Sequence, residues 1–221
     1  MKKACPIILF IVFCPLIFCG QKAEIGIKTG VSLNKFYGEP LFNKVQDKIT
    51  GYFFGAELRW KLENNLSLGT GLLYQRTGSM MNDLEFTDNL GNTIAYGDWK
   101  QKLDYLAVPA MVHFSFGTKN AFSLGAGLFG AYLLSAKGQL ANDSININFP
   151  ARTDISDNYE KMNFGLVGTA SYRFSLPGNK SLLLGFEEYL GLKNINRSET
   201  AEKIKTHSYG FFASLLVGFK K

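Results

Sequence analysis

Alternation of apolar with polar or small residues, with a period of two, is the feature that most constrains the fold of this chain. In the segment 25–34, isoleucine, threonine, valine and leucine alternate with glycine, lysine, serine and asparagine. A period of two is typical of β-strands with two different faces. Similar alternation occurs in seven further segments: 51–62, 66–75, 103–116, 121–136, 160–175, 181–194 and 206–219. The sequence therefore predicts an all-β protein with eight strands.

The connections between these segments alternate in length. Three are short and contain Gly, Asn or Pro: 63–65, 117–120 and 177–180. Four are long and polar: 37–50, 78–102, 137–159 and 195–205. An even number of strands with short turns on one side and long loops on the other is typical of bacterial outer-membrane barrels. We therefore predict an eight-stranded antiparallel up-and-down transmembrane β-barrel in the cell outer membrane, with the long loops outside the cell.

The first twenty residues have the features of a secretory signal peptide. Lys2 and Lys3 precede an almost unbroken apolar run over 6–19, which matches the charged and apolar regions of such a signal. The run is shorter than the ~20 residues that a membrane-spanning helix needs. We predict cleavage after Gly20, with a lipoprotein signal acylated at Cys19 as the alternative. The expected organisation is a signal peptide over 1–20 and one barrel domain over 21–221.

The composition of the mature chain excludes several functional classes. All three cysteines lie in the predicted signal peptide, so the mature chain should have no disulfide, cysteine metal site or cysteine nucleophile: Cys5, Cys14 and Cys19. Of the 24 lysines and arginines, 22 remain after Lys2 and Lys3 are removed, against 18 acidic residues. The resulting net charge of +4 is spread along the chain, whereas nucleic-acid binding needs a clustered basic face. We expect no nucleic-acid partner.

Aromatic residues at outward-facing positions fall into two groups. If the first strand runs outward, one group lies near the periplasmic strand ends: Trp60, Phe114, Phe122, Tyr172 and Phe219. The other lies near the extracellular strand ends: Tyr52, Tyr74, Tyr132, Phe164 and Tyr209. Two aromatic girdles at the membrane interfaces are a property of transmembrane barrels. A soluble β-sandwich, which is the alternative fold, gives no reason for such sorting.

Polar residues at inward-facing positions predict a charged barrel interior. The predicted interior network contains Lys28, Glu57, Arg59, Gln75, His113, Asn163, Arg173 and Glu187. An eight-stranded barrel is just wide enough for side chains to fill, and charges buried there must be paired. We therefore expect a plug of paired side chains, with a narrow proton or ion path as the alternative. No cofactor or metal is expected.

Glu188 does not fit the outward-facing pattern. It shares parity with Leu184, Phe186, Leu190 and Leu192, so it should face lipid, where a charge is costly. Either a β-bulge turns this stretch, or Glu188 faces a protein partner.

Four stretches resemble the PorT-like family of outer-membrane β-barrels from Bacteroidota. They are 25–33 (IGIKTGVSL), 103–109 (LDYLAVP), 132–137 (YLLSAK) and 191–195 (GLKNI). At the second stretch the family tends to have Glu where this chain has Ala107, so an inward carboxylate is missing. The resemblance implies an eight-stranded outer-membrane barrel. Founding members of the family are linked to type IX secretion and gliding, and most members have no assigned activity.

Candidate catalytic and metal-binding residues are few. His113 and Ser115 resemble the His-x-Ser pair of lipid A deacylase barrels, but both have inward parity near the periplasmic end, which is the wrong face and depth. Asp154 and Asp157 could contact a cation, but the stretch lacks the Gly and Glu of a calcium loop. We therefore expect no enzyme.

Three hypotheses for function follow, in order of preference. The first is a non-enzymatic structural or interaction barrel that uses the loops 78–102 and 137–159. The second is an accessory subunit of a type IX secretion or gliding machine, with Glu188 facing a partner. The third is a lipid-modifying enzyme. The expected partners are outer-membrane lipid and lipopolysaccharide, with other envelope or secretion proteins as candidates.

Overall fold

The structure is a computed structural model that describes residues 23–38, 44, 46–63, 65–87, 90–91, 93–117, 121–140, 152–198 and 203–219. The predicted signal peptide, 1–20, lies outside the described residues. Within the described residues, no helix is long and apolar enough to cross a membrane.

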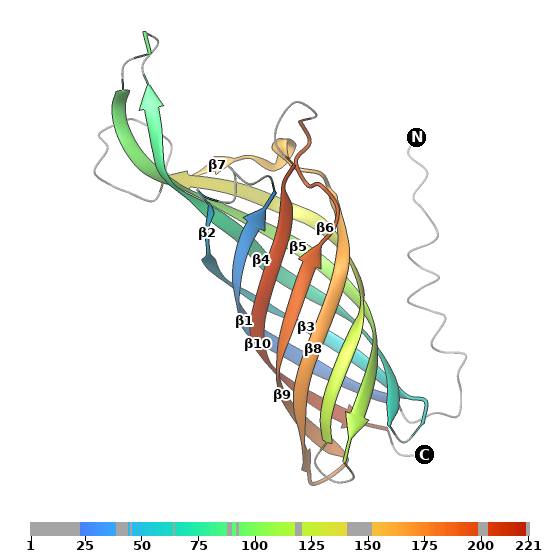
Figure 1. The fold of residues 1–221 in the computed structure, drawn as a ribbon. Helices are drawn as coiled ribbons and strands as arrows, with labels where there is room; N and C mark the ends of the chain where they lie inside the picture. Colours follow the sequence, from blue (N-terminus) through green and yellow to red (C-terminus); the bar gives the residue numbers. More distant parts are fainter. Residues whose placement is uncertain are drawn as a thin grey trace, which may run out of the picture.

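Eight antiparallel strands form a closed ring (Figure 1). They are β1 (Ala23–Tyr37), β3 (Ile49–Lys61), β4 (Leu66–Thr87), β5 (Thr93–Phe116), β6 (Ala121–Leu140), β8 (Met162–Leu176), β9 (Lys180–Gly191) and β10 (Lys205–Gly218). Each strand pairs with the next one in the ring, and β10 pairs with β1 from Glu24–Gly218 to Tyr37–Lys205. The predicted fold class is confirmed.

Three short elements complete the described structure. The strands β2 (Gln46–Asp47) and β7 (Thr153–Asp154) pair with β4 and β6, respectively. A single 3₁₀ turn, η2 (Ser156–Asn158), follows β7. Between β8 and β9, Gly178 and Asn179 have φ angles of 77° and 59°, which tight hairpin turns require and which Gly and Asn tolerate best.

The prediction of a loop over 78–102 is wrong, because most of these residues belong to strands β4 and β5. β4 and β5 stay paired up to Thr87–Thr93, with register shifts after Met81 and Phe86. The resulting β4–β5 hairpin projects beyond the other strands (Figure 1). Strands in water need no apolar face, so the period-two signal disappears while backbone pairing continues. Similarly, β6 continues to Leu140, inside the predicted loop 137–159. Residues 141–151 of that loop lie outside the described structure.

We call the barrel end with this projection the hairpin end and the opposite end the turn end. Between the two ends, outward-facing apolar side chains are exposed, as a lipid-facing wall requires. Ile27 and Phe211 are 71% and 70% exposed, whereas the inward-facing Leu183 and Leu216 are fully buried. The ten predicted girdle aromatics have the outward parity, and the register pairs Phe122 with Tyr172 at the turn end.

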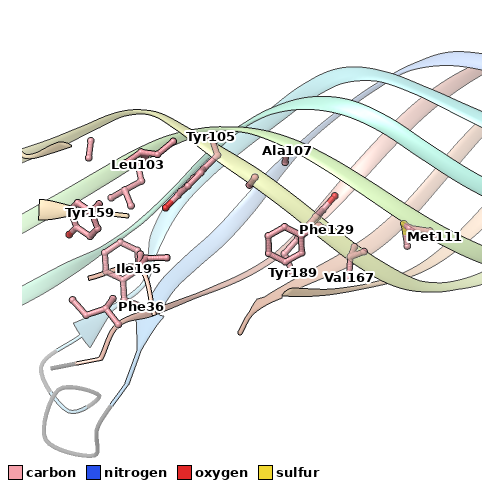
Figure 2. Close-up of a cluster of buried hydrophobic side chains, with 14 residues drawn as sticks. Phe36, Leu103, Tyr105, Ala107, Met111, Phe129, Tyr159, Val167, Tyr189 and Ile195 are labelled. Atoms are coloured by element: carbon pink, nitrogen blue, oxygen red, sulfur yellow. The ribbon is translucent and has the colours of Figure 1, made fainter. Parts of the chain in front are cut away.

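Apolar side chains fill the barrel interior toward the hairpin end (Figure 2). This upper apolar cluster consists of Phe36, Leu103, Tyr105, Ala107, Met111, Phe129, Ala131, Leu133, Ala136, Tyr159, Val167, Tyr189, Ile195 and Ile204. A smaller cluster contains Phe53, Leu183, Phe212 and Leu216. Tyr159 comes from the β7–β8 connection, and Ile195 and Ile204 come from the β9–β10 connection. The described parts of these two connections therefore close this end of the interior.

Candidate functional site

The centre of the barrel interior contains a buried ion pair between distant parts of the chain. Lys28 Nζ, on β1, donates a hydrogen bond to Glu187 Oε2, on β9. The ammonium group also lies over two aromatic rings, 4.1 Å from the centroid of Phe212 and 5.8 Å from that of Phe53. Cation–π contacts of this kind strengthen when the cation is desolvated. The charge of Lys28 is therefore compensated by one carboxylate and two aromatic faces.

Glu57 lies beside this ion pair and has two polar neighbours. Its Oε1 accepts a hydrogen bond from Ser214 Oγ and lies 3.9 Å from Arg59 Nε. Both charged side chains are buried. Because Glu57 and Arg59 are two residues apart on β3, they project into the same interior.

A second ionic group lies at the turn end. Arg173 donates two hydrogen bonds to the carboxylate of Glu24, both 2.9 Å long, and a third of 3.0 Å to Ser181 Oγ. Lys61 Nζ lies 3.1 Å from Glu24 Oε1, with its side chain 43% exposed. Glu24 is absent from the predicted network. Its parity matches that of Lys28, so extending the first predicted strand by one residue would have found it.

The interior charges balance within the described residues. Three interior cations, Lys28, Arg59 and Arg173, face three carboxylates, Glu24, Glu57 and Glu187. Removing one partner of a buried pair leaves an uncompensated charge, which is strongly destabilising. Each interior ion pair therefore stabilises the packed interior only while both of its partners are present.

The remaining predicted interior residues, Asn163, Gln75 and His113, are not members of these ion pairs. Asn163 Nδ2 donates to Thr206 Oγ1 at 2.9 Å, and Gln75 is buried on the inner face of β4. His113 packs between Gly69 and Gly125, where an added Cβ would lie 2.7 and 2.4 Å from its ring atoms. These two glycines make room for the imidazole.

The space left inside the network is small. A cavity lined by Lys28, Glu57, Arg59, Met111 and His113, among others, offers about 20 Å³ to water, which is enough for roughly one molecule. A cavity with room for only about one water molecule fits a packed plug rather than an open pore.

His113 and Ser115 do not form a catalytic pair in this arrangement. Ser115 Oγ donates to Ser123 Oγ at 3.4 Å, whereas His113 Nδ1 is buried without a hydrogen-bond partner in the described structure. A nucleophile needs a base within hydrogen-bond reach, and neither side chain reaches the outer surface as a lipid-directed enzyme would require.

Asp154 and Asp157 lie near η2. The carboxylate of Asp154 accepts the backbone N–H of Ser156 at 2.9 Å. Hydrogen bonds from Ser156 hold the pKa of Asp154 below its ordinary value. Among the described residues, no three His, Cys, Asp or Glu side chains gather in a way that could hold a metal ion.

Glu188 faces outward, as its parity predicts, and it has a partner within the chain. His207 Nε2, on β10, lies 2.7 Å from Glu188 Oε1. The register from β8 through β9 to β10 has no shift at Glu188, so the β-bulge alternative is wrong. Sequence reasoning missed His207 because its partner lies on a different strand, 19 residues earlier.

The β4–β5 hairpin has two open edges. In the described residues, β4 beyond Met81 and β5 before Trp99 pair only with each other, so the outer edge of each strand has no partner strand there. Residues 82–98 contain four acidic residues and no lysine or arginine. Tyr96 and Leu90 are 62% and 86% exposed. Open strand edges with exposed apolar side chains are surfaces to which other chains can bind.

An open hollow of about 450 Å³ also lies at the hairpin end. It is lined by Gln101, Asp157, Asn158, Tyr159, Asn196, Arg197, Ser198 and Ile204. Because Tyr159 and Ile204 also belong to the upper apolar cluster, that cluster forms the floor of the hollow and separates it from the ion pairs.

Comparison with known proteins identifies the family. The sequence profile of the family described as "Outer membrane protein beta-barrel domain" matches residues 19–197. No curated protein sequence matches the chain.

Several solved structures are similar to the chain at low sequence identity. The outer membrane protein OprG from Pseudomonas aeruginosa has 8% identity and a TM-score of 0.50, covering 91% of this chain and 98% of its own. Neisserial surface protein A, NspA, has 14% identity and a TM-score of 0.49, with coverages of 88% and 97%. The outer membrane protease OmpT from Escherichia coli has 10% identity and a TM-score of 0.46, with coverages of 90% and 97%.

Proposed function

Because the chain belongs to the outer membrane protein β-barrel domain family, we propose that it is a non-enzymatic barrel whose β4–β5 hairpin contacts molecules outside the cell. The barrel lies in the outer membrane. The observation that carries the proposal is the hairpin itself, whose two edges have no partner strand among the described residues beyond Met81 and Trp99. The part of the hairpin that extends past the barrel does not stabilise the barrel interior. We therefore infer that it acts by contacting molecules outside the barrel.

The interior supports a structural rather than a transport role. Paired charges and the upper apolar cluster fill it, and the cavity between them has room for about one water molecule. Ser115 donates its hydrogen bond to Ser123 rather than to His113, which supports a non-enzymatic role. The proposed mature chain is 21–221, after removal of the signal peptide. Proposed partners are outer-membrane lipid and lipopolysaccharide, together with a surface molecule that binds the hairpin, and not nucleic acid.

Photocrosslinking on intact cells tests the hairpin role. A photoreactive amino acid replaces Tyr96, which is 62% exposed on the hairpin. In a control it replaces Lys180, the first residue of β9 at the turn end. The proposal predicts a discrete adduct from position 96 and none of that mass from position 180. If positions 96 and 90 both give no adduct, the proposal is wrong.

A narrower proposal is that the chain is a PorT-like barrel and an accessory subunit of a type IX secretion or gliding machine. Its support is the resemblance of the four stretches named above. The pairing of Glu188 with His207 means that the charge of Glu188 no longer requires a protein partner. Purification in mild detergent tests this proposal. A stoichiometric envelope protein should copurify with a subunit, whereas a barrel isolated alone contradicts it.

A further inference from the structure

Three lysines lie together on the outer wall of the barrel at the hairpin end. Lys35 and Lys205 occupy outward positions on neighbouring strands β1 and β10, and Lys48 immediately precedes β3 on the other side of β1. Lys205 Nζ lies 5.8 Å from the ring centroid of Tyr37, and Lys48 Nζ lies 5.1 Å from that of Tyr209. We call Lys35, Lys48 and Lys205 the lysine patch.

Among the described residues, the lysine patch has no compensating carboxylate. Within the part of the chain that the structure describes, no Asp or Glu lies within ion-pair distance of any of its three lysines. Glu188 is hydrogen-bonded to His207 and pairs in the register with Tyr209, two residues closer to the turn end than His207. Like charges on neighbouring strands are destabilising, and an anion bound between Lys35, Lys48 and Lys205 would remove that cost.

The surface below the patch is apolar. Toward the turn end, the outward positions on β1 and β10 hold Tyr209, Leu33, Val31 and Phe211. Val31 and Phe211 are 59% and 70% exposed. Tyrosines mark the level of the membrane interface, so the lysines lie at headgroup depth above an acyl-chain surface. A ligand that fits both parts must carry an anionic head and several hydrocarbon chains.

We propose that the lysine patch binds the phosphate groups of lipopolysaccharide in the outer leaflet, with Leu33, Val31 and Phe211 in contact with its acyl chains. Basic side chains beside a membrane attract anionic headgroups, and the outer-leaflet glycolipid of this membrane carries its phosphates at that depth. This inference gives a site to the lipopolysaccharide contact of the proposed function. It does not depend on the hairpin, so the crosslinking experiment and the test below fail independently.

The test is a binding titration of the full barrel, purified from outer membranes in a zwitterionic detergent. The probes are purified lipopolysaccharide, its dephosphorylated form, phosphatidylglycerol and inorganic phosphate. The patch variant combines Lys35→Gln, Lys48→Gln and Lys205→Gln. The matched control loses the same charge at exposed positions elsewhere, through Lys161→Gln, Lys180→Gln and Arg197→Gln. Migration of unboiled samples on detergent gels verifies that both variants are folded.

We expect the patch variant to bind lipopolysaccharide about 100-fold more weakly than wild type, since each basic residue near the surface contributes about a factor of five. The control variant should bind lipopolysaccharide as tightly as wild type does. Wild type should bind dephosphorylated lipopolysaccharide as weakly as the patch variant binds intact lipopolysaccharide. Unchanged binding by the patch variant, or an equal loss in the control, overturns the proposal. Equally tight binding of phosphatidylglycerol or inorganic phosphate overturns the assignment to lipopolysaccharide.

Discussion

Lys28 and Glu187 form a hydrogen-bonded ion pair in the barrel interior although they are 159 positions apart in sequence. The pair connects β1 to β9 across β10 and lies against the rings of Phe53 and Phe212. Because both side chains are almost fully buried, each charge depends on the other. The pair therefore links the beginning and the end of the chain inside the closed barrel.

Removing one partner should expose this dependence. We expect Lys28→Met to reduce the free energy of unfolding by about 3–5 kcal/mol, since it leaves Glu187 charged and unpaired. The double variant Lys28→Met with Glu187→Leu should recover most of that loss. Lys61→Met is the control, because its ion pair with Glu24 is half exposed and should contribute about 0–1 kcal/mol. Urea unfolding in lipid vesicles measures all three. Equal effects of Lys28→Met and Lys61→Met would contradict the account.

The sequence predicted the strand number and the two faces of the wall because a period of two is a local property. Residues 25–34 show it without any knowledge of their neighbours. The pairing of Lys28 with Glu187 could not be predicted in this way, since it depends on the stagger between strands around the ring. The length of β4 and β5 was missed for another reason. Between Met81 and Trp99 the strands leave the barrel, and nothing there requires an alternating apolar face.

Neighbouring residues on opposite faces of β6 provide a test of the strand register. Leu128 is 61% exposed on the outer wall, whereas Phe129 is buried in the upper apolar cluster. Leu128→Arg should cost ~2–4 kcal/mol near the middle of the bilayer, and Leu128→Ala much less. Phe129→Ala should cost ~3–5 kcal/mol through the cavity that it leaves.

Leu58→Arg provides the depth control, because Leu58 lies only two residues from the girdle residue Trp60. Its cost should be smaller than that of Leu128→Arg, since the penalty falls toward the interface. Urea unfolding in vesicles gives the comparison. A severe Leu128→Ala with a mild Phe129→Ala would mean that the two faces are exchanged.

The space around His113 gives a third prediction. A Cβ at Gly125 would lie 2.4 Å from His113 Nδ1 and 2.6 Å from Thr169 Oγ1. Gly125→Ala should therefore cost ~1–3 kcal/mol by overpacking, and adding His113→Ala should restore part of it. Gly130→Ala, on the same strand, is the matched control, because its Cβ would meet nothing within 4 Å. Thermal unfolding of the refolded barrel distinguishes them. If Gly125→Ala is as mild as Gly130→Ala, the packing around His113 is wrong.

The β4–β5 hairpin should be dispensable for folding. Replacing residues 82–98 with an Asn-Gly turn joins Met81 to Trp99, which are already paired. No barrel strand pairs with the removed part in the described structure, so the urea midpoint and gel migration should match those of wild type. The shortened barrel should lose the crosslinking target of the hairpin. A variant that fails to insert would show that the hairpin belongs to the folding core.

We expect the closed outer-membrane barrel to expose its β4–β5 hairpin outside the cell and its short turns to the periplasm. With the predicted signal peptide removed, the mature chain has no cysteine, so single cysteines report on topology directly. The measurement is labelling of intact cells with a membrane-impermeant maleimide, using Tyr96→Cys on the hairpin and Lys180→Cys at the turn end. The account predicts labelling at position 96 on intact cells, and labelling at position 180 only after the outer membrane is permeabilised. Labelling at position 180 but not at position 96 on intact cells would contradict it.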